Sequence, residues 1–170
     1  MKSQFQQVLA VVLIAVGVFL LLRVTVQSFV VVGSSMEPNL EDGQRLLVNK
    51  VVYHLRDPHR GEIIVFQQPT GMHADLIKRV IAIPGDTIEI KDGAVYLNGS
   101  AIDEPYIADA PSYTMAEKEI PEEEYFVLGD NRNNSNDSHR WGTVPREDII
   151  GEAWLSIWPP GSIPNYNLQE

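Results

Sequence analysis

The chain has 170 residues, 44% of them hydrophobic, which is enough to form one packed domain. Its net charge of −10 excludes a typical nucleic-acid binder, because no basic stripe exists to neutralise phosphates. It contains no cysteine, which rules out disulfides, a cysteine-based zinc site and a thiol nucleophile.

The N-terminal segment carries the one long apolar run of the chain. Val8–Leu22 reads VLAVVLIAVGVFLLL and has no charged residue. A membrane-spanning helix needs about 20 residues, so the run predicts a transmembrane helix whose Arg23 snorkels to the headgroups. The alternative is a cleavable secretory signal with Lys2 as its basic n-region, although no A-x-A cleavage site follows. Residues 1–23 therefore form a predicted tip and anchor, and residues 24–170 a separate folded domain. Basic residues on both sides of the run leave its orientation open.

Beyond the anchor, short β-branched runs bounded by turn residues predict strands. Asp92-Gly93 predicts a hairpin, and Asn98-Gly99 predicts another turn. No long helical periodicity follows the anchor, so the expected fold is a mostly β, antiparallel domain. The acidic segment Asp103–Tyr125 is interpreted as a solvated excursion between strands. The predicted strands are Val24–Val32, Arg45–Val52, Glu62–Gln67, Leu76–Ile83, Thr87–Ile90, Ala94–Leu97, Tyr125–Leu128 and Ala153–Trp158.

Two serines follow the first predicted strand, in the sequence GSSMEPNL. Neither the G-x-S-x-G nor the S-x-x-K pattern is present around Ser34 and Ser35, which argues against an α/β-hydrolase elbow and a β-lactamase site. Both serines are explained equally well as turn formers. A nucleophilic serine would need a base, and the candidates are a lysine held neutral or one of the histidines, His54, His59, His73 and His139.

Lys78 is the lysine that its neighbours single out. In DLIKRVIAIPGD, strand alternation places it in one row with Leu76, Val80 and Ala82. Burial among apolar residues disfavours the ammonium and would lower its pKa from about 10.4, which would let the amine accept a serine proton. The alternative is an edge lysine whose amine snorkels to solvent.

The polar run GDNRNNSNDSHRWG covers residues 129–142. A calcium loop beginning at Asp130 would have Arg132 as its third residue and Ser135 where glycine is needed, so no metal site is predicted here. The histidines show no ligand spacing. Glycosylation sequons begin at Asn98, Asn133 and Asn136, but the pattern is short and presupposes a secretory compartment.

Taken in order, the apolar anchor, GSSMEPNL, RGEIIVF, IKRVIAIPGD and GDNRNNSNDSHRWG resemble the successive boxes of the type I signal peptidases, the membrane-bound Ser/Lys peptidases. The resemblance extends from about Phe29 to Trp158. The amino-acid sequence of the last box is most similar to that of cyanobacterial and thylakoid members. A mostly β, antiparallel catalytic domain with one N-terminal transmembrane helix is the fold that this resemblance implies.

The resemblance implies a role for particular residues. Ser35 would be the nucleophile and Lys78 the general base. Ser135 would hydrogen-bond the Lys78 amine and orient it. Asp130 would support the site through Arg79, and Asp137 would brace the loop.

The same resemblance implies hydrolysis after a small residue at the end of a signal peptide, with no metal or organic cofactor. The Ser35 backbone N–H would donate to the oxyanion, and an apolar, strand-lined groove would bind the extended substrate. The partners would be signal-peptide-bearing preproteins and the lipid bilayer, close to the export translocon. The enzyme would be a single-pass protein of the plasma or thylakoid membrane, with an uncleaved anchor, a short cytoplasmic N-terminus and the catalytic domain on the periplasmic or lumenal side.

The chain departs from the family pattern at three positions. Gly33 stands where some members carry a serine that serves the oxyanion hole, so the second oxyanion donor is open. His139 precedes Arg140 where many relatives have arginine directly after Asp-Ser, which leaves the partner of Asp137 open. Asn39 replaces the usual threonine at an expected turn. Two alternatives stand beside the general peptidase: a Ser/Lys processing peptidase for a few substrates, and a tethered β-rich binding protein without catalysis.

Overall fold

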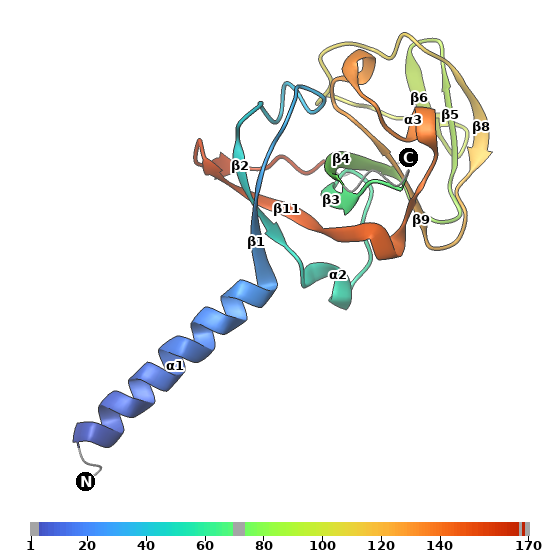
Figure 1. Cartoon of the computed structure of the whole chain (residues 1–170). Helices are drawn as coiled ribbons and strands as arrows, with labels where there is room; N and C mark the ends of the chain where they lie inside the picture. Colours follow the sequence, from blue (N-terminus) through green and yellow to red (C-terminus); the bar gives the residue numbers. More distant parts are fainter. Residues whose placement is uncertain (1–3, 70–73, 167, 169–170) are drawn as a thin grey trace.

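The computed structural model describes residues 4–69, 74–166 and 168 (Figure 1). One long helix, α1 (Gln4–Thr25), leads into a domain built from twelve strands and four short helical segments in the described part of the chain. The strands are β1 (Val26–Val30), β2 (Arg45–Asn49), β3 (Ile63–Gln67), β4 (Asp75–Ala82), β5 (Thr87–Lys91), β6 (Ala94–Leu97), β7 (Ser100–Ala101), β8 (Met115–Glu119), β9 (Glu124–Leu128), β10 (Val144–Pro145), β11 (Ile149–Trp158) and β12 (Gly161–Ser162). The short helices are α2 (Val52–Leu55), η1 (Arg132–Asn134), α3 (Ser138–Trp141) and η2 (Arg146–Asp148).

α1 projects from the β domain as a separate rod and continues directly into β1 (Figure 1). The helix runs to Thr25, so the strand begins later than the predicted Val24. β1 begins where its backbone pairing with β2 begins, with Val26 opposite Asn49. A helix is thus present where an anchor was expected. Within the described residues, however, no helix is both long and apolar enough to cross a membrane, and the predicted transmembrane span is not supported.

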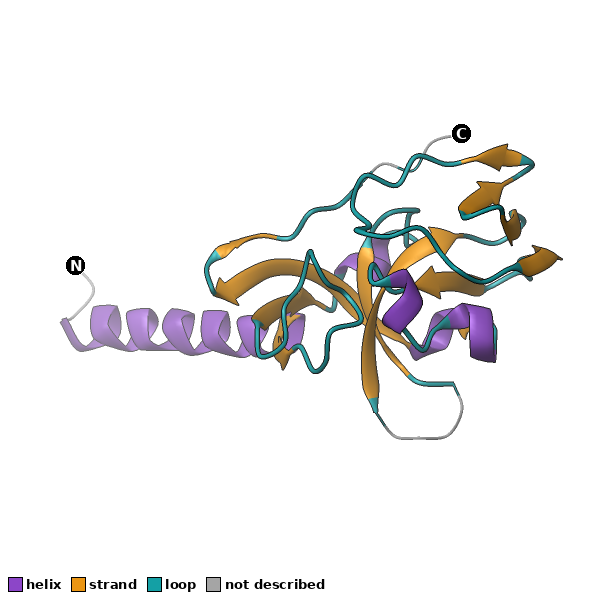
Figure 2. Ribbon diagram, turned by 90° about the horizontal axis from the view of Figure 1, so that it is seen from above, coloured by secondary structure: helices purple, strands orange, loops and turns teal. Residues whose placement is uncertain are grey.

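The strands form two antiparallel sheets (Figure 2). The large sheet has the order β1-β2-β11-β3-β4-β9-β10, and β12 pairs with β11. The small sheet has the order β7-β6-β5-β8. Each described strand pair is antiparallel, which confirms the predicted mostly β, antiparallel fold.

Each of the predicted strands overlaps a strand of the structure, and the predicted turns are present. Asp92 and Gly93 have φ of 51° and 75° between β5 and β6, as a tight hairpin requires. The prediction that the second strand extends to Val52 is wrong. Asn49 ends β2, because its side-chain Oδ1 accepts hydrogen bonds from the backbone of Val51 and Val52 and starts a turn into α2.

The interpretation of Asp103–Tyr125 as a solvated excursion is wrong in part. This segment contains β8, which pairs with β5 at the edge of the small sheet. Tyr106 and Ile120 from the same segment are buried in the core. β8 escaped prediction because it is an edge strand with mostly exposed side chains, so it lacks the alternation of apolar residues that marks a half-buried strand.

The core lies on both faces of the large sheet. On one face, Ile81 of β4 and Phe126 of β9 pack against the small sheet. On the other, Val80 and Val127 from the same two strands join Phe66 of β3 in a second cluster. A third cluster packs the segment after β1 against β2, β3 and β11. Packing on both sides fixes the middle of β4 and leaves its first residues beside the segment that follows β1.

Candidate active site

Ser35 lies in a tight turn directly after β1. Gly33 has a φ of 86°, and its N–H donates to Asp42 Oδ1 at 2.7 Å. The next residue after Ser35 is Met36, whose side chain is fully buried and whose carbonyl accepts from the backbone of Leu40 at 3.0 Å. A left-handed glycine before the serine and a buried methionine after it therefore hold the Ser35 side chain at the surface of the core.

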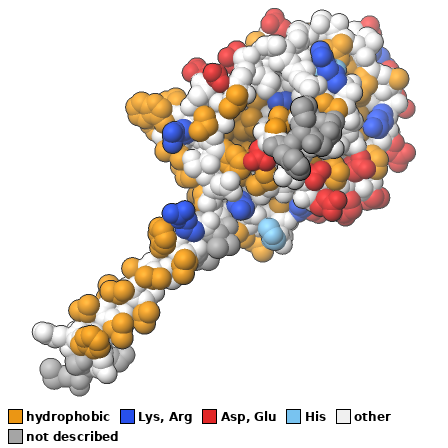
Figure 3. Space-filling model, in the orientation of Figure 1, with side chains coloured by type: hydrophobic (Ala, Val, Ile, Leu, Met, Phe, Trp, Pro, Cys, Tyr) orange, Lys and Arg blue, Asp and Glu red, His pale blue; other side chains and the backbone are white. Residues whose placement is uncertain are grey.

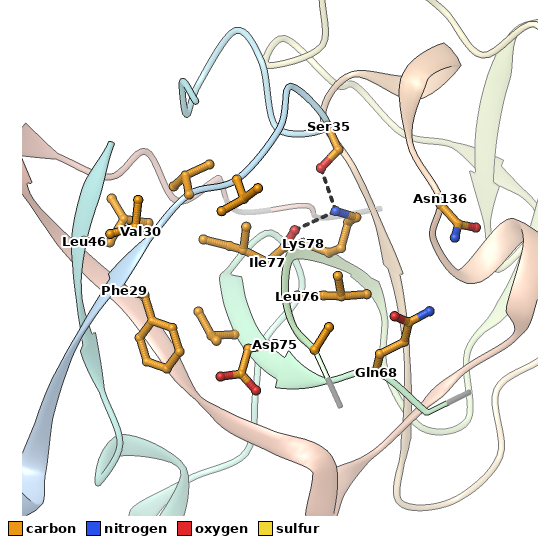
Figure 4. Close-up of a pocket in the computed structure, with 14 residues that line it drawn as sticks. Phe29, Val30, Ser35, Leu46, Gln68, Asp75, Leu76, Ile77, Lys78 and Asn136 are labelled. Carbon is orange, nitrogen blue, oxygen red and sulfur yellow. Dashed lines mark hydrogen bonds between the residues drawn. The ribbon is translucent and has the colours of Figure 1, made fainter. Parts of the chain in front are cut away.

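Lys78 of β4 reaches the serine directly. Its Nζ is 2.7 Å from Ser35 Oγ and 2.8 Å from the carbonyl oxygen of Ile77 (Figure 4). The side chain is buried, which excludes the alternative of a lysine that snorkels to solvent. Burial lowers the pKa of Lys78 to about 8, and the charges of Asp137 and Asp130 oppose this shift only in part.

The polar loop after β9 packs against the backbone of the two serines. The Asn131 N–H donates to the Ser35 carbonyl at 3.0 Å, and the Asn131 side chain donates to the Ser34 carbonyl at 3.1 Å. Asn134 Nδ2 donates to Ser34 Oγ at 2.9 Å. A Cβ on Gly129 would lie 2.5 Å from the Ser35 carbonyl oxygen, so only glycine permits this approach. The loop thereby fixes the serine turn from one side.

A buried ion pair lies behind the site. Arg79 and Asp130 pair through two hydrogen bonds, Nε to Oδ1 at 2.9 Å and Nη2 to Oδ2 at 2.8 Å, and both side chains are fully buried. Asn39 Nδ2 donates to Asp130 Oδ2 at 2.8 Å and to the Tyr106 carbonyl at 2.7 Å. Asn39 therefore connects the serine turn to the pair, a contact that its expected place in a turn did not indicate.

Ser135 does not make the hydrogen bond to the Lys78 amine that the resemblance implied. The Lys78 Nζ is directed at Ser35 Oγ and at the carbonyl of its own strand. Ser135 Oγ is buried and has no hydrogen bond of standard geometry among the described residues, but its hydroxyl faces Asp137 and helps to lower the pKa of that carboxyl. It lies against Gly129, where a Cβ would come within 2.3 Å of it. Ser135 thus borders the site on the side of the loop.

Asp137 is paired with His139, which answers the question raised by the missing arginine. The two side chains are 2.5 Å apart, Nδ1 to Oδ1, and Asp137 Oδ2 accepts the N–H of Gly129 at 2.9 Å. Burial by itself would raise the pKa of Asp137, but the hydrogen bonds from His139 and Gly129 lower it below its ordinary value. Arg140 Nε donates to His139 Nε2 at 3.1 Å, so the histidine proton lies on Nδ1.

The other candidate histidines have partners away from the serine. His54 Nδ1 contacts the Lys50 carbonyl, and His59 Nδ1 lies 3.5 Å from Glu62. His73 lies outside the described residues. In the part of the chain that the structure describes, no group of three or more His, Asp or Glu side chains is arranged to hold a metal. Lys78 is thus the candidate base that contacts Ser35.

An apolar groove of about 480 Å³ begins at Ser35 and Lys78 and runs between β1 and β4 (Figure 4). Within the described residues, β4 pairs with β3 from Asp75 to Arg79 but with β9 only from Arg79 onward, so its first residues have one unpaired edge there. β1 is the terminal strand of its sheet and has a free edge as well. The groove is lined by Phe29, Val30, Val31, Val32, Ser35, Leu46, Val65, Gln68, Ala74, Asp75, Leu76, Ile77, Lys78 and Asn136.

Comparisons with known proteins give the family. Residues 5–158 match the family described as signal peptidase, peptidase S26. The chain is 49% identical to the probable signal peptidase I-2 of Synechocystis sp., over 74% of this chain and 60% of that protein. It is 42% identical to the signal peptidase I of Leptolyngbya laminosa, over 85% and 77% of the two chains. The thylakoidal processing peptidase 1 of Arabidopsis thaliana is 36% identical, over 76% of this chain and 41% of that protein.

A solved structure has the same fold. The crystal structure of a signal peptidase I from Enterococcus faecalis matches with a TM-score of 0.52 and 32% identity, covering 56% of this chain and 95% of that chain. The protein belongs to the signal peptidase family, peptidase S26. This confirms the predicted family, that of a serine endopeptidase which removes signal peptides, and its similarity to cyanobacterial and thylakoid members.

Proposed function

We propose that the protein cleaves signal peptides from preproteins with Ser35 as the nucleophile and Lys78 as the general base. The observation that carries this proposal is the 2.7 Å distance between Ser35 Oγ and Lys78 Nζ at one end of an apolar groove. A nucleophile and a base within hydrogen-bond reach meet the first geometric requirement for this chemistry. Family membership supports the same reaction.

The proton transfer follows from the surroundings of the amine. As an ammonium, Lys78 donates hydrogen bonds to Ser35 Oγ and to the Ile77 carbonyl. With a pKa of about 8, roughly a tenth of the molecules carry a neutral amine at pH 7. The neutral amine keeps its donation to Ile77 and presents a lone pair to the Ser35 hydroxyl. Lys78 takes the serine proton during attack, gives it to the leaving amine, and then activates the water that hydrolyses the acyl-enzyme.

The substrate would bind as an additional strand. The free edges of β1 and of the start of β4 border the groove, so an extended peptide can form main-chain hydrogen bonds there. The groove is lined mostly by apolar side chains, and from family membership we propose that a small side chain precedes the cleaved bond. The Ser35 N–H makes no hydrogen bond within the described residues and is the proposed oxyanion donor.

We assign positioning roles to the other residues of the site. Arg79 and Asp130 form a rigid pair behind Lys78, joined through Asn39 to the serine turn. Asp137 holds the loop through its hydrogen bond with the Gly129 N–H. Ser135 lies against Gly129 and borders the site on the side of the loop.

Membrane attachment through α1 is part of the same proposal. The side chains from Phe5 to Leu20 are mostly apolar and exposed, which no packing within the described chain accounts for. Figure 3 shows hydrophobic side chains along the visible face of α1. Lipid is the partner that such a surface fits. The β domain would then face the periplasm or the thylakoid lumen, close to the translocon from which preproteins emerge.

The test is cleavage of a purified signal-bearing precursor in detergent, followed by intact-mass analysis. Wild-type protein should make a single cut after a small residue, and both Ser35→Ala and Lys78→Ala should lose nearly all of this activity. Ser34→Ala is the matched control, because Ser34 is adjacent and its hydroxyl contacts Asn134 instead of Lys78. Full activity of Ser35→Ala or Lys78→Ala would refute the proposed chemistry, and cleavage of only one of several unrelated precursors would indicate a specialised peptidase.

A further inference from the structure

His139 lies beside the buried carboxylate of Asp137, at a position where the family pattern has arginine. Its Nδ1 is 2.5 Å from Asp137 Oδ1. The Asp137 side chain is fully buried, and the His139 side chain is only 10% exposed. Because water hardly screens charges at such a position, it matters whether residue 139 carries a charge or only donates a hydrogen bond.

The hydrogen bonds of the ring indicate a neutral imidazole. Arg140 Nε donates to His139 Nε2 at 3.1 Å. A nitrogen that accepts a hydrogen bond carries no proton, so the one ring proton is on Nδ1 and is donated to Asp137. A second proton on Nε2 would meet the permanent charge of Arg140. His139 therefore supplies Asp137 with a hydrogen bond, whereas an arginine at this position would supply a positive charge as well.

Tyr113 holds the ring in this orientation from a different segment. Tyr113 and His139 stack with their ring centroids 4.0 Å apart and an interplanar angle of 17°. The adjacent Ser112 is joined to the loop after β9, because its N–H and its hydroxyl both donate to Asn133 Oδ1, at 2.8 and 2.7 Å. The segment before β8 thus packs on the face of the imidazole and keeps its Nδ1 edge directed at Asp137.

The other charged groups around the imidazole are an ion pair and an exposed arginine. Arg132 and Glu104, which lie near Tyr113, are buried and pair with each other, so their charges largely cancel. Arg140 is exposed, so solvent screens its charge. The imidazole ring also lies between Arg140 and the carboxylate, because the two groups bind its two opposite nitrogens.

Asp137 has no permanent cation as a partner. Within the described residues, its carboxylate forms no ion pair with a lysine or an arginine. Burial by itself would raise its pKa, but hydrogen bonds lower the pKa below the ordinary value, so the carboxylate stays charged. The groups that make these contacts are neutral: the His139 ring, the Gly129 N–H and the Ser135 hydroxyl.

This carboxylate is one residue away from contact with the serine turn. Its Oδ2 accepts the N–H of Gly129 at 2.9 Å. Gly129 lies against Ser35, since a Cβ on this glycine would come within 2.5 Å of the Ser35 carbonyl oxygen. Burial lowers the pKa of Lys78 to about 8, and of the two carboxylates that oppose this shift Asp137 has the larger effect. The other is Asp130, whose charge is already compensated by a bidentate ion pair.

We propose that His139 is a positioning residue: it holds the Asp137 carboxylate near Lys78 without compensating its negative charge, and so sets the strength of Lys78 as a base. This inference rests on the proposed role of Lys78. A stronger base holds its own proton up to a higher pH and, once neutral, takes the Ser35 proton more readily. An arginine at position 139 would make Lys78 a weaker base that is neutral at lower pH. The histidine thus moves the working range of this chain toward alkaline pH.

Substitutions of His139 separate its charge from its hydrogen bond. The full chain in detergent cleaves a purified signal-bearing precursor, and kcat/KM is measured across the acid limb of the pH profile. His139→Gln keeps a neutral donor for Asp137 and should leave the apparent pKa unchanged. His139→Arg and His139→Lys each place a cation beside Asp137 and should lower the apparent pKa by about 0.5 or more, because the Lys78 ammonium loses part of its stabilisation. His54→Arg adds the same charge at an exposed position, where the histidine ring contacts the Lys50 carbonyl, and should cause no shift.

A second measurement does not depend on cleavage. In protein that contains isotopically labelled lysine, the Cε resonance of Lys78 is followed by NMR against pH and is assigned by its loss in Lys78→Met. The His139 substitutions should move this titration in the same direction as the apparent pKa of cleavage. A wild-type protein that cleaves no precursor would refute the proposed function, and the titration would still decide the role of His139.

Three results would overturn the inference. An unchanged Lys78 titration in both His139→Arg and His139→Lys would mean that a charge at position 139 does not act on the amine. A titration at higher pH in His139→Gln would mean that His139 is a cation in the wild-type protein. A shift in His54→Arg equal to that in His139→Arg would mean that net charge, and not its position beside Asp137, determines the base strength.

Discussion

Two neighbouring cations of β4 are buried in opposite ways. Arg79 makes a bidentate pair with Asp130, donates to the carbonyls of Gly61 and Pro164 at 2.7 and 3.0 Å, and lies 4.3 Å from the centre of the Tyr106 ring. Among the described residues, Lys78, one residue earlier, hydrogen-bonds only to the Ser35 hydroxyl and to the Ile77 carbonyl of its own strand. Both side chains are buried, but of the two charges only that of Arg79 is compensated by a carboxylate partner among the described residues.

The difference teaches how the domain separates structure from chemistry. A guanidinium stays protonated, so burying one is tolerable only with a complete set of acceptors. A lysine ammonium can lose its proton. The absence of a carboxylate partner makes this loss easier. The paired cation therefore fixes the strand, and the unpaired cation on the same strand is available as a base.

The largest expected effect comes from Lys78→Met. We expect activity to fall by about 10² to 10⁴-fold, the usual contribution of general acid–base catalysis. Stability should rise at the same time. The folded pKa of about 8 lies below the unfolded value near 10.5, so the folded state binds fewer protons, and burial of the ammonium costs up to about 3 kcal/mol below pH 8. The wild type recovers this cost as the pH rises from about 8 to 10.5.

Urea unfolding of both proteins at several pH values, in one detergent, checks this. The stability difference between Lys78→Met and wild type should be greatest at pH 7 and should shrink toward pH 10.5. Lys78→Arg is the matched control, because arginine keeps the buried charge and does not release its proton. It should be inactive without any gain in stability. A less stable Lys78→Met protein would contradict the view of Lys78 as an uncompensated charge.

Arg79→Met should have the opposite effect on stability. Removing the guanidinium leaves Asp130 buried with Asn39 as its remaining side-chain donor, and breaking a buried pair in this way costs about 3 to 5 kcal/mol. Denaturant unfolding measures the loss. Arg79→Met combined with Asp130→Leu removes both charges and should recover much of it. If the double variant is as unstable as the single one, the cost comes from packing and not from the unpaired carboxylate.

The pH dependence of cleavage is a smaller and more specific test. Activity should require the neutral Lys78 amine, so kcat/KM should rise about tenfold per pH unit up to an apparent pKa of about 8 and then level off. Asp137→Asn removes a charge that holds this pKa up and should move the profile to lower pH. A profile that keeps rising to pH 10 would mean that Lys78 is solvated in the working enzyme.

The sequence predicted those features that depend on local pattern. Alternation in DLIKRVIA placed Lys78 in an apolar row, and the structure buries it there. Asp92-Gly93 predicted its hairpin because positive φ is a local requirement. The site residues Ser35 and Lys78 were named through the family resemblance, since no local rule brings positions 35 and 78 together.

What could not be predicted depends on contacts between distant segments. β8 is a strand only because β5 offers an edge to pair with. Asn131 and Asn134 bind the serine turn across about a hundred positions of sequence, and their composition indicated nothing beyond a polar loop. The Ser135 contact implied by the resemblance is missing for the same reason: the Lys78 amine is directed at Ser35 and Ile77, and sequence does not fix that direction.

The smallest expected effect concerns Asn39, which belongs to the Arg79 side of the comparison. Its Nδ2 donates to Asp130 and to the Tyr106 carbonyl, and Asp130 keeps both bonds from Arg79 when Asn39 is lost. Asn39→Ala should therefore cost only about 2 kcal/mol of stability, the net value of two typical hydrogen bonds. Asn39→Asp should cost more, because it replaces the donor by a second carboxylate beside Asp130.

Neither Asn39 variant should change the apparent pKa of cleavage as much as Asp137→Asn does, since Asn39 carries no charge and does not contact Lys78. Urea unfolding and the pH profile of kcat/KM, measured on the same samples, keep the two effects apart. A pH profile that shifts in Asn39→Ala by as much as in Asp137→Asn would mean that the Asp130 pair and the Lys78 amine respond as one unit. The two cations of β4 would then not be independent, and the separation of structure from chemistry along this strand would fail.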